Sequence, residues 1–334
     1  MDTAYVASRT TGTWTGLENI NQVDPKYLSL KGTLRSDIGS PEAAAAGIGS
    51  PYPGFSGSVA QALRPYPQYT TIWDMFQPTG YSTYHSLQAR LQKNLSNGLS
   101  FLTSYTFSKN IGVQGSDSFG DPFGGGGATA MDTFNRKLDK AILGIDQTHV
   151  LVISWNYELP FGHGKRFASN SNPVLNAVIG GWQVNSIERY QSGTPISVGG
   201  GGNIPLFGGG NRPNWISNKV RSGVAMSSFD PAKDVYLNIN AFSQPAAYTF
   251  GNAPKRLPNV RRPALYNEDF SAFKRFSLGA ESRYLEFRGE LFNVFNRVVF
   301  GGPAANINSP STFGTIGSQA NDPRVVQFAL KLLF

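Results

Sequence analysis

The chain has 334 residues, of which 40% are hydrophobic and only 15% are charged, and no stretch approaches the roughly 20 consecutive apolar residues of a membrane-spanning helix. The absence of cysteine excludes disulfides, thiolate metal sites and cysteine nucleophiles. A net charge of +8 suits a nucleic-acid binder only if Lys and Arg gather on one face. They are scattered, and their densest group, residues 255–262, lies in a Pro-rich connection, so we expect no nucleic-acid partner.

Glycine (38 residues), proline (21) and aromatic residues (13%) predict an all-β chain with long irregular connections. In chain order, residues 2–8 resemble the latter part of a strand. No basic segment followed by an apolar one marks a secretory signal, and we therefore expect an incomplete sequence. Residues 10–81 form a long unpatterned connection, within which residues 69–75 could add a short strand.

A hairpin follows this connection. Apolar and polar side chains alternate over residues 84–95 and again over residues 99–109. Ser96, Asn97 and Gly98 supply the tight turn between the two strands.

The next two strands are predicted at residues 149–159 and 182–192, after the Gly-rich connection at 110–148. Alternation is clear in the first of them, where Trp155 and Tyr157 near the strand end suit the aromatic girdle of a membrane barrel. It is weaker in the second.

A second hairpin is predicted from residues 269–278 and 284–295, joined across residues 279–283. One face of its second strand carries three charges of alternating sign, on Glu286, Arg288 and Glu290. Such charges are either hydrated in a polar lumen or paired with neighbours, and they would be very costly in a dry core.

The last predicted strand covers residues 324–334. One of its faces carries Gln327 and Lys331, whereas the other is purely apolar and consists of Val326, Phe328, Leu330, Leu332 and Phe334. The run is about as long as a tilted strand needs to span a bilayer. On this segment alone, a half-buried strand of a soluble β-domain is the alternative.

The order of the connections decides between these alternatives. Long connections alternate along the chain with shorter ones, the long ones being 10–81, 110–148, 193–267 and 296–323 and the shorter ones 96–98, 160–181 and 279–283. Short periplasmic turns and long extracellular loops are typical of bacterial outer-membrane barrels. A soluble sandwich has no reason to separate its loops by length, so the pattern predicts an antiparallel transmembrane β-barrel in the cell outer membrane.

Several phrases resemble the C-terminal barrel region of TonB-dependent outer-membrane transporters, and the Oar-like subgroup most closely. The similarity runs in the same order over nearly the whole chain, through Tyr84–Ile111 (YHSLQARLQKNLSNGLSFLTSYTFSKNI), Asn156–Phe167 (NYELPFGHGKRF), Gly180–Val198 (GGWQVNSIERYQSGTPISV), Phe287–Gly301 (FRGELFNVFNRVVFG) and Asp322–Phe334 (DPRVVQFALKLLF).

This resemblance implies a barrel of about 22 strands with an N-terminal plug in its lumen. About eight spanning strands are predicted here, so residues 1–334 correspond to the last third or so of such a barrel, without plug domain or signal peptide. The barrel-assembly machinery would read the terminal Phe334. Other implied partners are outer-membrane lipid and lipopolysaccharide, an unknown nutrient ligand, and the TonB system through the missing plug.

The function implied by the resemblance is energised uptake of a bulky nutrient. The alternative is a small passive pore or structural barrel closed by these strands alone, since about eight strands also make the smallest closed barrels. A soluble enzyme or adhesin-like β-domain is a third class, and we expect no enzyme because no catalytic constellation is present.

Candidate chemical motifs are few, and we predict no catalytic, cofactor-binding or metal residue. His85, His149 and His163 lie far apart, with no second ligand at metal spacing, and are expected to be interfacial or packed. The GHGKR segment at Gly162–Arg166 lacks the remainder of a phosphate loop and is predicted to be a periplasmic turn.

Loop residues offer two further candidates, each with a plainer interpretation. Asp117, Asp121 and Asp132 could bind a hard cation, but their irregular spacing favours a solvated loop. Glycine tracts at 124–127, 199–202 and 208–210 are predicted to be flexible surface loop. Aromatic loop residues either stack on a carbohydrate or peptide ligand or pack the loops together, namely Trp215, Tyr236, Phe242, Tyr248 and Phe250.

Overall fold

A single antiparallel sheet dominates the computed structural model, which describes all residues except 16–17, 75–76, 114–129, 203, 205–209 and 281–282. Its nine strands follow the order β1-β4-β5-β7-β8-β11-β12-β13, with the short β6 (Ala141–Ile142) paired beside β5. The long strands are β1 (Asp2–Thr13), β4 (Gly80–Ser96), β5 (Leu99–Val113), β7 (His149–Glu158), β8 (Trp182–Gln191), β11 (Leu265–Ala280), β12 (Arg283–Phe292) and β13 (Val325–Leu333). The prediction of an all-β antiparallel fold is confirmed.

Short elements occupy the connections. They are the strands β2 (Glu18–Asn19), β3 (Trp73–Asp74), β9 (Asn214–Trp215) and β10 (Phe242–Ser243), the 3-10 helices η1 (Pro25–Arg35), η2 (Arg136–Asp139), η3 (Met226–Ser228) and η4 (Ile239–Ala241), and the α-helices α1 (Pro41–Ala45), α2 (Val59–Ala62) and α4 (Pro173–Ile179). The short strand predicted within 69–75 is β3, which pairs with β2. In the described part of the chain, none of the helices has the length and apolar character to cross a membrane.

Several strand ends differ from their predicted positions. β1 pairs with β4 from Asp2 through Thr13, so the predicted end at residue 8 was wrong. The added residues of β1 are mostly threonine, which fits a pleated backbone but adds no apolar alternation to the sequence. In contrast, β12 ends at Phe292 rather than at residue 295, because Asn293 and Asn296 adopt positive φ angles of 51° and 50° and turn the chain.

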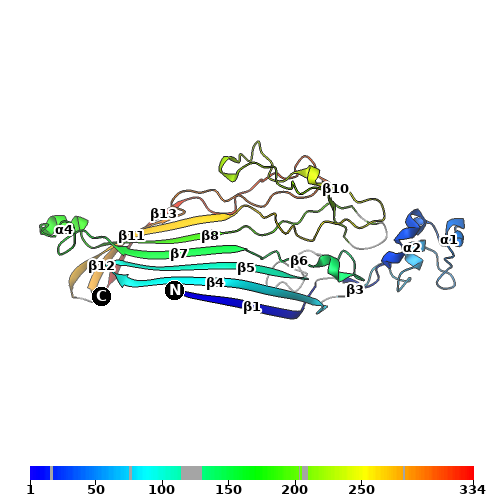
Figure 1. Cartoon of the computed structure of the whole chain (residues 1–334), viewed down its shortest axis with the longest axis horizontal. Coiled ribbons are helices and arrows are strands. Elements are labelled where there is room, and N and C mark those ends of the chain that lie inside the picture. The colour runs from blue at the N-terminus through cyan, green and yellow to red at the C-terminus, as the bar shows by residue number, and fades with distance from the viewer. Residues whose placement is uncertain (16–17, 75–76, 114–129, 203, 205–209, 281–282) are drawn as a thin grey trace.

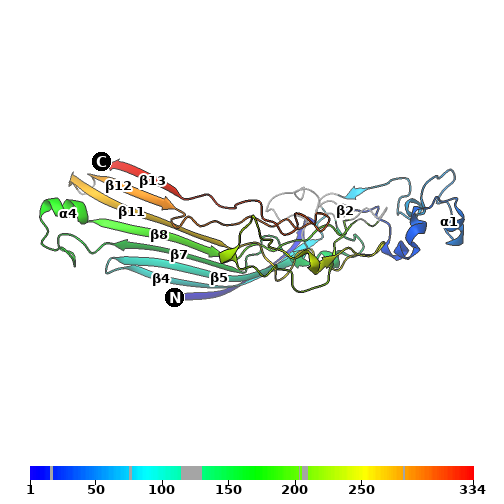
Figure 2. The same cartoon turned by 90° about the horizontal axis from the view of Figure 1, so that it is seen from above.

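Connections of different length lie at opposite ends of the sheet (Figures 1 and 2). The long ones gather at one end together with α1 and α2, while α4 and the tight turns lie at the other end, near both termini of the chain. The predicted separation of loops by length is therefore confirmed.

The sheet is curved and open. Its outermost strands, β1 and β13, each pair with a single neighbour, β4 and β12 respectively. Their outer edges therefore present backbone N–H and C=O groups with no strand partner among the described residues.

Strand register aligns the apolar face of β13 with that of β12. In β13, Phe328 lies opposite Gly289 of β12, and Leu330 lies opposite Phe287. On the other face, Gln327 lies opposite Glu290, and Lys331 lies opposite Glu286. A slip of one residue would reverse both faces, so this alignment is strongly specified.

The long connections fold into a cap with two apolar cores of its own. The first core contains Val220, Tyr236 and Leu237, each at most 2% exposed, from the connection between β8 and β11, and is joined by Ile307 and Phe313 from the connection between β12 and β13. The second core is built mainly from the connection between β1 and β4, around Val23, Leu34, Ala43, Val59 and Ala60. Hydrophobic burial thus holds these connections in place.

Spin labels along β13 test the assignment of its faces. Single cysteines at positions 325 to 333 can each be labelled uniquely, because the chain has no cysteine of its own. In lipid vesicles we expect high oxygen accessibility at positions 326, 328, 330 and 332 and high accessibility to an aqueous nickel complex at 327, 329 and 331, since successive side chains alternate between faces. Equal accessibility on both faces would contradict the assignment.

Candidate functional site

The polar face of the sheet carries a continuous set of paired charges. Glu286 accepts from Arg275 at 2.8 Å and from Arg288 at 3.0 Å, and Arg288 also reaches Glu290 at 3.5 Å. Of the two predicted alternatives, hydration or pairing, pairing is therefore present, from Glu286 to Arg275 of β11 and within β12 for Arg288. Glu286 is nearly buried under its partners, whereas the side chain of Arg275 is 54% exposed. Such a face is wettable and can line an aqueous lumen.

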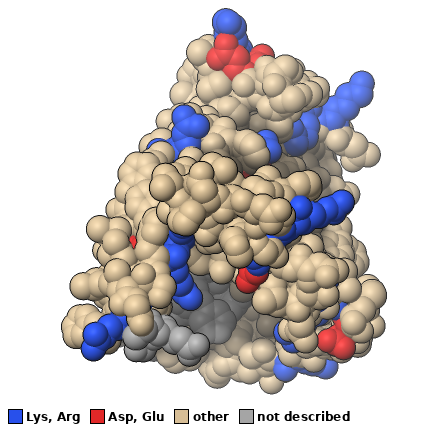
Figure 3. Space-filling model, turned by 90° about the vertical axis from the view of Figure 1, so that its left-hand side faces the viewer, with Lys and Arg blue, Asp and Glu red and all other residues tan. Residues whose placement is uncertain are grey.

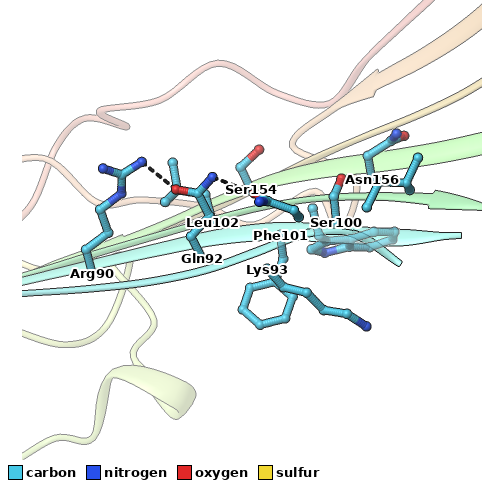
Figure 4. Close-up of a pocket in the computed structure, with 11 residues that line it drawn as sticks. Arg90, Gln92, Lys93, Ser100, Phe101, Leu102, Ser154 and Asn156 are labelled. Carbon is cyan, nitrogen blue, oxygen red and sulfur yellow. Dashed lines mark hydrogen bonds between the residues drawn. The ribbon is translucent and has the colours of Figure 1, made fainter. Parts of the chain in front are cut away.

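Near the short-turn end, residues of β4, β5 and β7 from both faces of the sheet line a shallow hollow of about 380 Å³. Arg90 donates to Gln92 at 2.7 Å, and Gln92 donates to Asn94 at 3.0 Å. Figure 4 shows polar side chains on one side of the ribbon, while Lys93 and Phe101 project from the other. The hollow offers amide, hydroxyl and guanidinium groups that can hydrogen-bond to a polar solute.

The apolar face bears two similar tyrosine–histidine pairs. The Tyr5 hydroxyl lies 2.5 Å from Nδ1 of His85, and the Tyr105 hydroxyl lies 2.8 Å from Nδ1 of His149, with the rings stacked in both cases. His85 and His149 were predicted to be packed or to lie at the membrane–water interface. The two pairs agree with that prediction and are consistent with an aromatic girdle. His163 lies apart from them, in the connection between β7 and β8, where its backbone N–H donates to Asn176.

A buried charge cluster joins three of the long connections. Arg136 of η2 pairs with Glu18 of β2 and lies 3.5 Å from Asp139. Arg212, from the connection between β8 and β11, lies 3.2 Å from the same Asp139. Burial lowers the pKa of both arginines, and the charge of Asp139 opposes that shift. We call Glu18, Arg136, Asp139 and Arg212 the loop-cap cluster.

A second ion pair fastens the loops to the sheet. Arg261 contacts Asp146 at 2.5 Å and donates to the carbonyl of Gly193 at 3.0 Å. Asp146 in turn accepts from the backbone N–H of Asn110 in β5 at 2.5 Å. Sequence reasoning missed both this pair and the loop-cap cluster, because their members come from irregular connections with no local spacing that marks them.

Of the three aspartates considered for a cation site, Asp117 and Asp121 lie outside the described residues. Asp132 is buried and accepts from Gln22 at 2.7 Å and from the backbone N–H of Phe134 at 3.0 Å, so the prediction that it is solvated was wrong. Within the described ranges, no group of three or more His, Asp or Glu could hold a metal ion.

The glycine segments differ from one another. Gly162–Arg166 lies in the connection between β7 and β8 at the short-turn end, as predicted. Gly201 is buried, and a Cβ there would come within 2.1 Å of the carbonyl carbon of Arg212, so the flexible surface loop predicted at 199–202 was wrong at this point. The tract at 124–127 lies outside the described residues, as do residues 208 and 209 of the third tract.

The aromatic loop residues pack the loops together. Tyr236 and Phe242 are buried in the first core, Trp215 packs against it, and Tyr248 and Phe250 pack against the second core. Of the two predicted alternatives, packing is therefore the one observed.

Basic side chains do not form a single patch at the short-turn end. Figure 3 views this end and shows Lys and Arg scattered over it, with acidic side chains among them. The positive charges at this end of the molecule are thus spread out rather than clustered.

Substitution of Asp139 by Asn tests the loop-cap cluster. It would leave Arg136 and Arg212 buried beside a neutral amide, a change that typically costs about 3–5 kcal/mol. We expect limited proteolysis to cut the long connections much faster in Asp139→Asn, with the β-sheet content measured by circular dichroism retained. The matched control is Asp230→Asn, whose partner Lys233 has an 80% exposed side chain. Equal proteolysis of both variants would contradict a stabilising role.

Comparison with known families gives the context of these features. The model of a family described as an outer membrane beta barrel domain matches residues 1–327. Searches against curated proteins and solved structures found no significant match. The family match covers nearly the whole chain and agrees with its antiparallel strands and its separation of long and short connections. The chain therefore belongs to the outer membrane beta-barrel family, and it resides in the cell outer membrane.

Proposed function

We propose that the chain forms part of the barrel of a TonB-dependent transporter, of the Oar-like kind, that takes up a bulky nutrient across the outer membrane. The observation that carries this proposal is the open sheet, in which β1 and β13 each have one unpaired edge among the described residues. Hydrocarbon does not tolerate unpaired backbone groups, so each edge requires a strand partner, which we propose that further strands supply. Added strands widen a barrel and make room for a large solute.

The loop cap supports the same proposal. Its two apolar cores and its buried charges give the extracellular side a defined shape, which a binding surface needs. Below the cap, the paired charges of β11 and β12 and the hydrogen-bonded side chains of Arg90, Gln92 and Asn94 provide a wettable path. Energy would come from the inner-membrane proton gradient, through TonB acting on a plug domain.

Other partners follow from the surfaces of the chain. Lipid and lipopolysaccharide would cover the apolar face, and the barrel-assembly machinery would read Phe334, which is 95% exposed. We further propose that the chain is not an enzyme and binds no cofactor, because its polar groups suit solute contact rather than a reaction.

The alternative is a passive pore closed by this chain alone. Closure would require β1 to pair with β13, and the alternation of strand directions along the sheet would make that pairing antiparallel. No pairing between these strands occurs in the described sheet.

Uptake in the native bacterium separates the two proposals. The strain lacking the gene is compared with the parent for accumulation of fluorescent oligopeptides and oligosaccharides too large for general porins. We expect one class to accumulate only with the gene present and only while the proton gradient is intact. Accumulation that survives a protonophore would favour the passive pore, and accumulation that is independent of the gene for every probe would overturn both proposals.

A further inference from the structure

A cavity of about 330 Å³ lies above the loop-side ends of β8 and β11. Four stretches of chain that are far apart in the sequence enclose it, contributing Gly144, Ser197, Arg256 and Pro303 among other residues. Its lining is more polar than apolar and contains two arginines, Arg256 and Arg262, but no aspartate or glutamate. We call it the two-arginine pocket.

Arg256 provides a fixed positive charge at this pocket. Its side chain is buried, the residue being 5% exposed, and it donates to the carbonyl of Ile142 at 3.4 Å. Burial lowers its pKa to about 10, so the guanidinium is still protonated at neutral pH. A buried cation of this kind attracts an anion more strongly than a fully hydrated one does.

Arg262 provides a second, accessible charge. Its backbone N–H donates to the carbonyl of Thr194 at 2.9 Å, which places the residue at the pocket wall. Its guanidinium lies against Gly302, where a Cβ would come within 3.0 Å of Nε. Among the described residues, this guanidinium has no ion-pair or hydrogen-bond partner, whereas the guanidinium of neighbouring Arg261 is neutralised by Asp146.

We propose that the two-arginine pocket binds an anionic oxygen group, a phosphate or a carboxylate. Guanidinium groups match the geometry of such oxygens with paired hydrogen bonds. Thr194 and Ser197 also line the pocket, and hydroxyl side chains are suitable neutral donors to an anion. The anion can come from a soluble solute or from a phosphorylated lipid of the outer leaflet. This inference goes beyond the proposed uptake, and its test measures binding without transport.

The experiment uses the full chain, purified in detergent, and Arg262→Gln. This residue is exposed, so its substitution leaves the apolar cores intact. Inorganic phosphate and succinate are titrated by calorimetry at low ionic strength, and we expect at least one of them to bind, with a loss of about tenfold or more in affinity for Arg262→Gln, as removal of one charge-assisted hydrogen bond predicts. The control is Lys219→Gln, which removes the same charge from an exposed position in the same connection and should leave affinity unchanged.

A second arm identifies the source of the anion. Vesicles of phosphatidylcholine with and without lipid A are titrated into the same proteins. Binding that requires both lipid A and Arg262, with no binding of phosphate or succinate, assigns the pocket to a lipid. Binding of a free anion that depends on Arg262 assigns it to a solute. The proposal is overturned if no probe binds, or if Arg262→Gln binds as tightly as the unaltered chain, and either result leaves the proposed uptake untouched.

Discussion

Hydrogen bonding of the backbone in the absence of water is the constraint on which this structure depends. A strand inside a bilayer can satisfy its N–H and C=O groups only through neighbouring strands. The sheet meets this demand by pairing each long strand with the next in register, as in the nine residues of β12 that lie opposite β13 from Tyr284 to Phe292. Pairing then fixes which side chains share a face, and the two faces are free to match two different solvents.

Long connections are compatible with this sheet because they are folded in their own right. Tyr236 and Leu237 are almost fully buried within the cap, and Asp139 holds two arginines from separate connections. Arg261 then ties the cap to the sheet through Asp146. The loop side is therefore a shaped surface, and the two-arginine pocket lies where the cap meets the strands.

Sequence reasoning located the elements in which apolar and polar side chains alternate along a strand. Alternation located β4, β5, β7, β12 and β13, because each strand meets lipid on one face and polar groups on the other. It failed in the loops, where Arg136 meets Glu18, and Gly201 meets Arg212, only through the tertiary fold. No spacing within a connection encodes such contacts. Length and composition identified these connections as loops without revealing that they share two cores.

The weak alternation of β8 is likewise explained by contacts with other parts of the chain. Register places Glu188 directly opposite Glu268 of β11, on the mostly apolar face of the sheet. Each carboxylate has its own donor, since the Trp155 indole donates to Glu188 at 3.0 Å and Arg297 contacts both oxygens of Glu268 at 2.9 and 3.1 Å. Both residues lie toward the loop-side ends of their strands, where lipid headgroups and water replace hydrocarbon. Because Arg297 neutralises Glu268 and the Trp155 indole donates to Glu188, the two acids are tolerated on an outward face, and the strand keeps its register although its sequence alternates poorly.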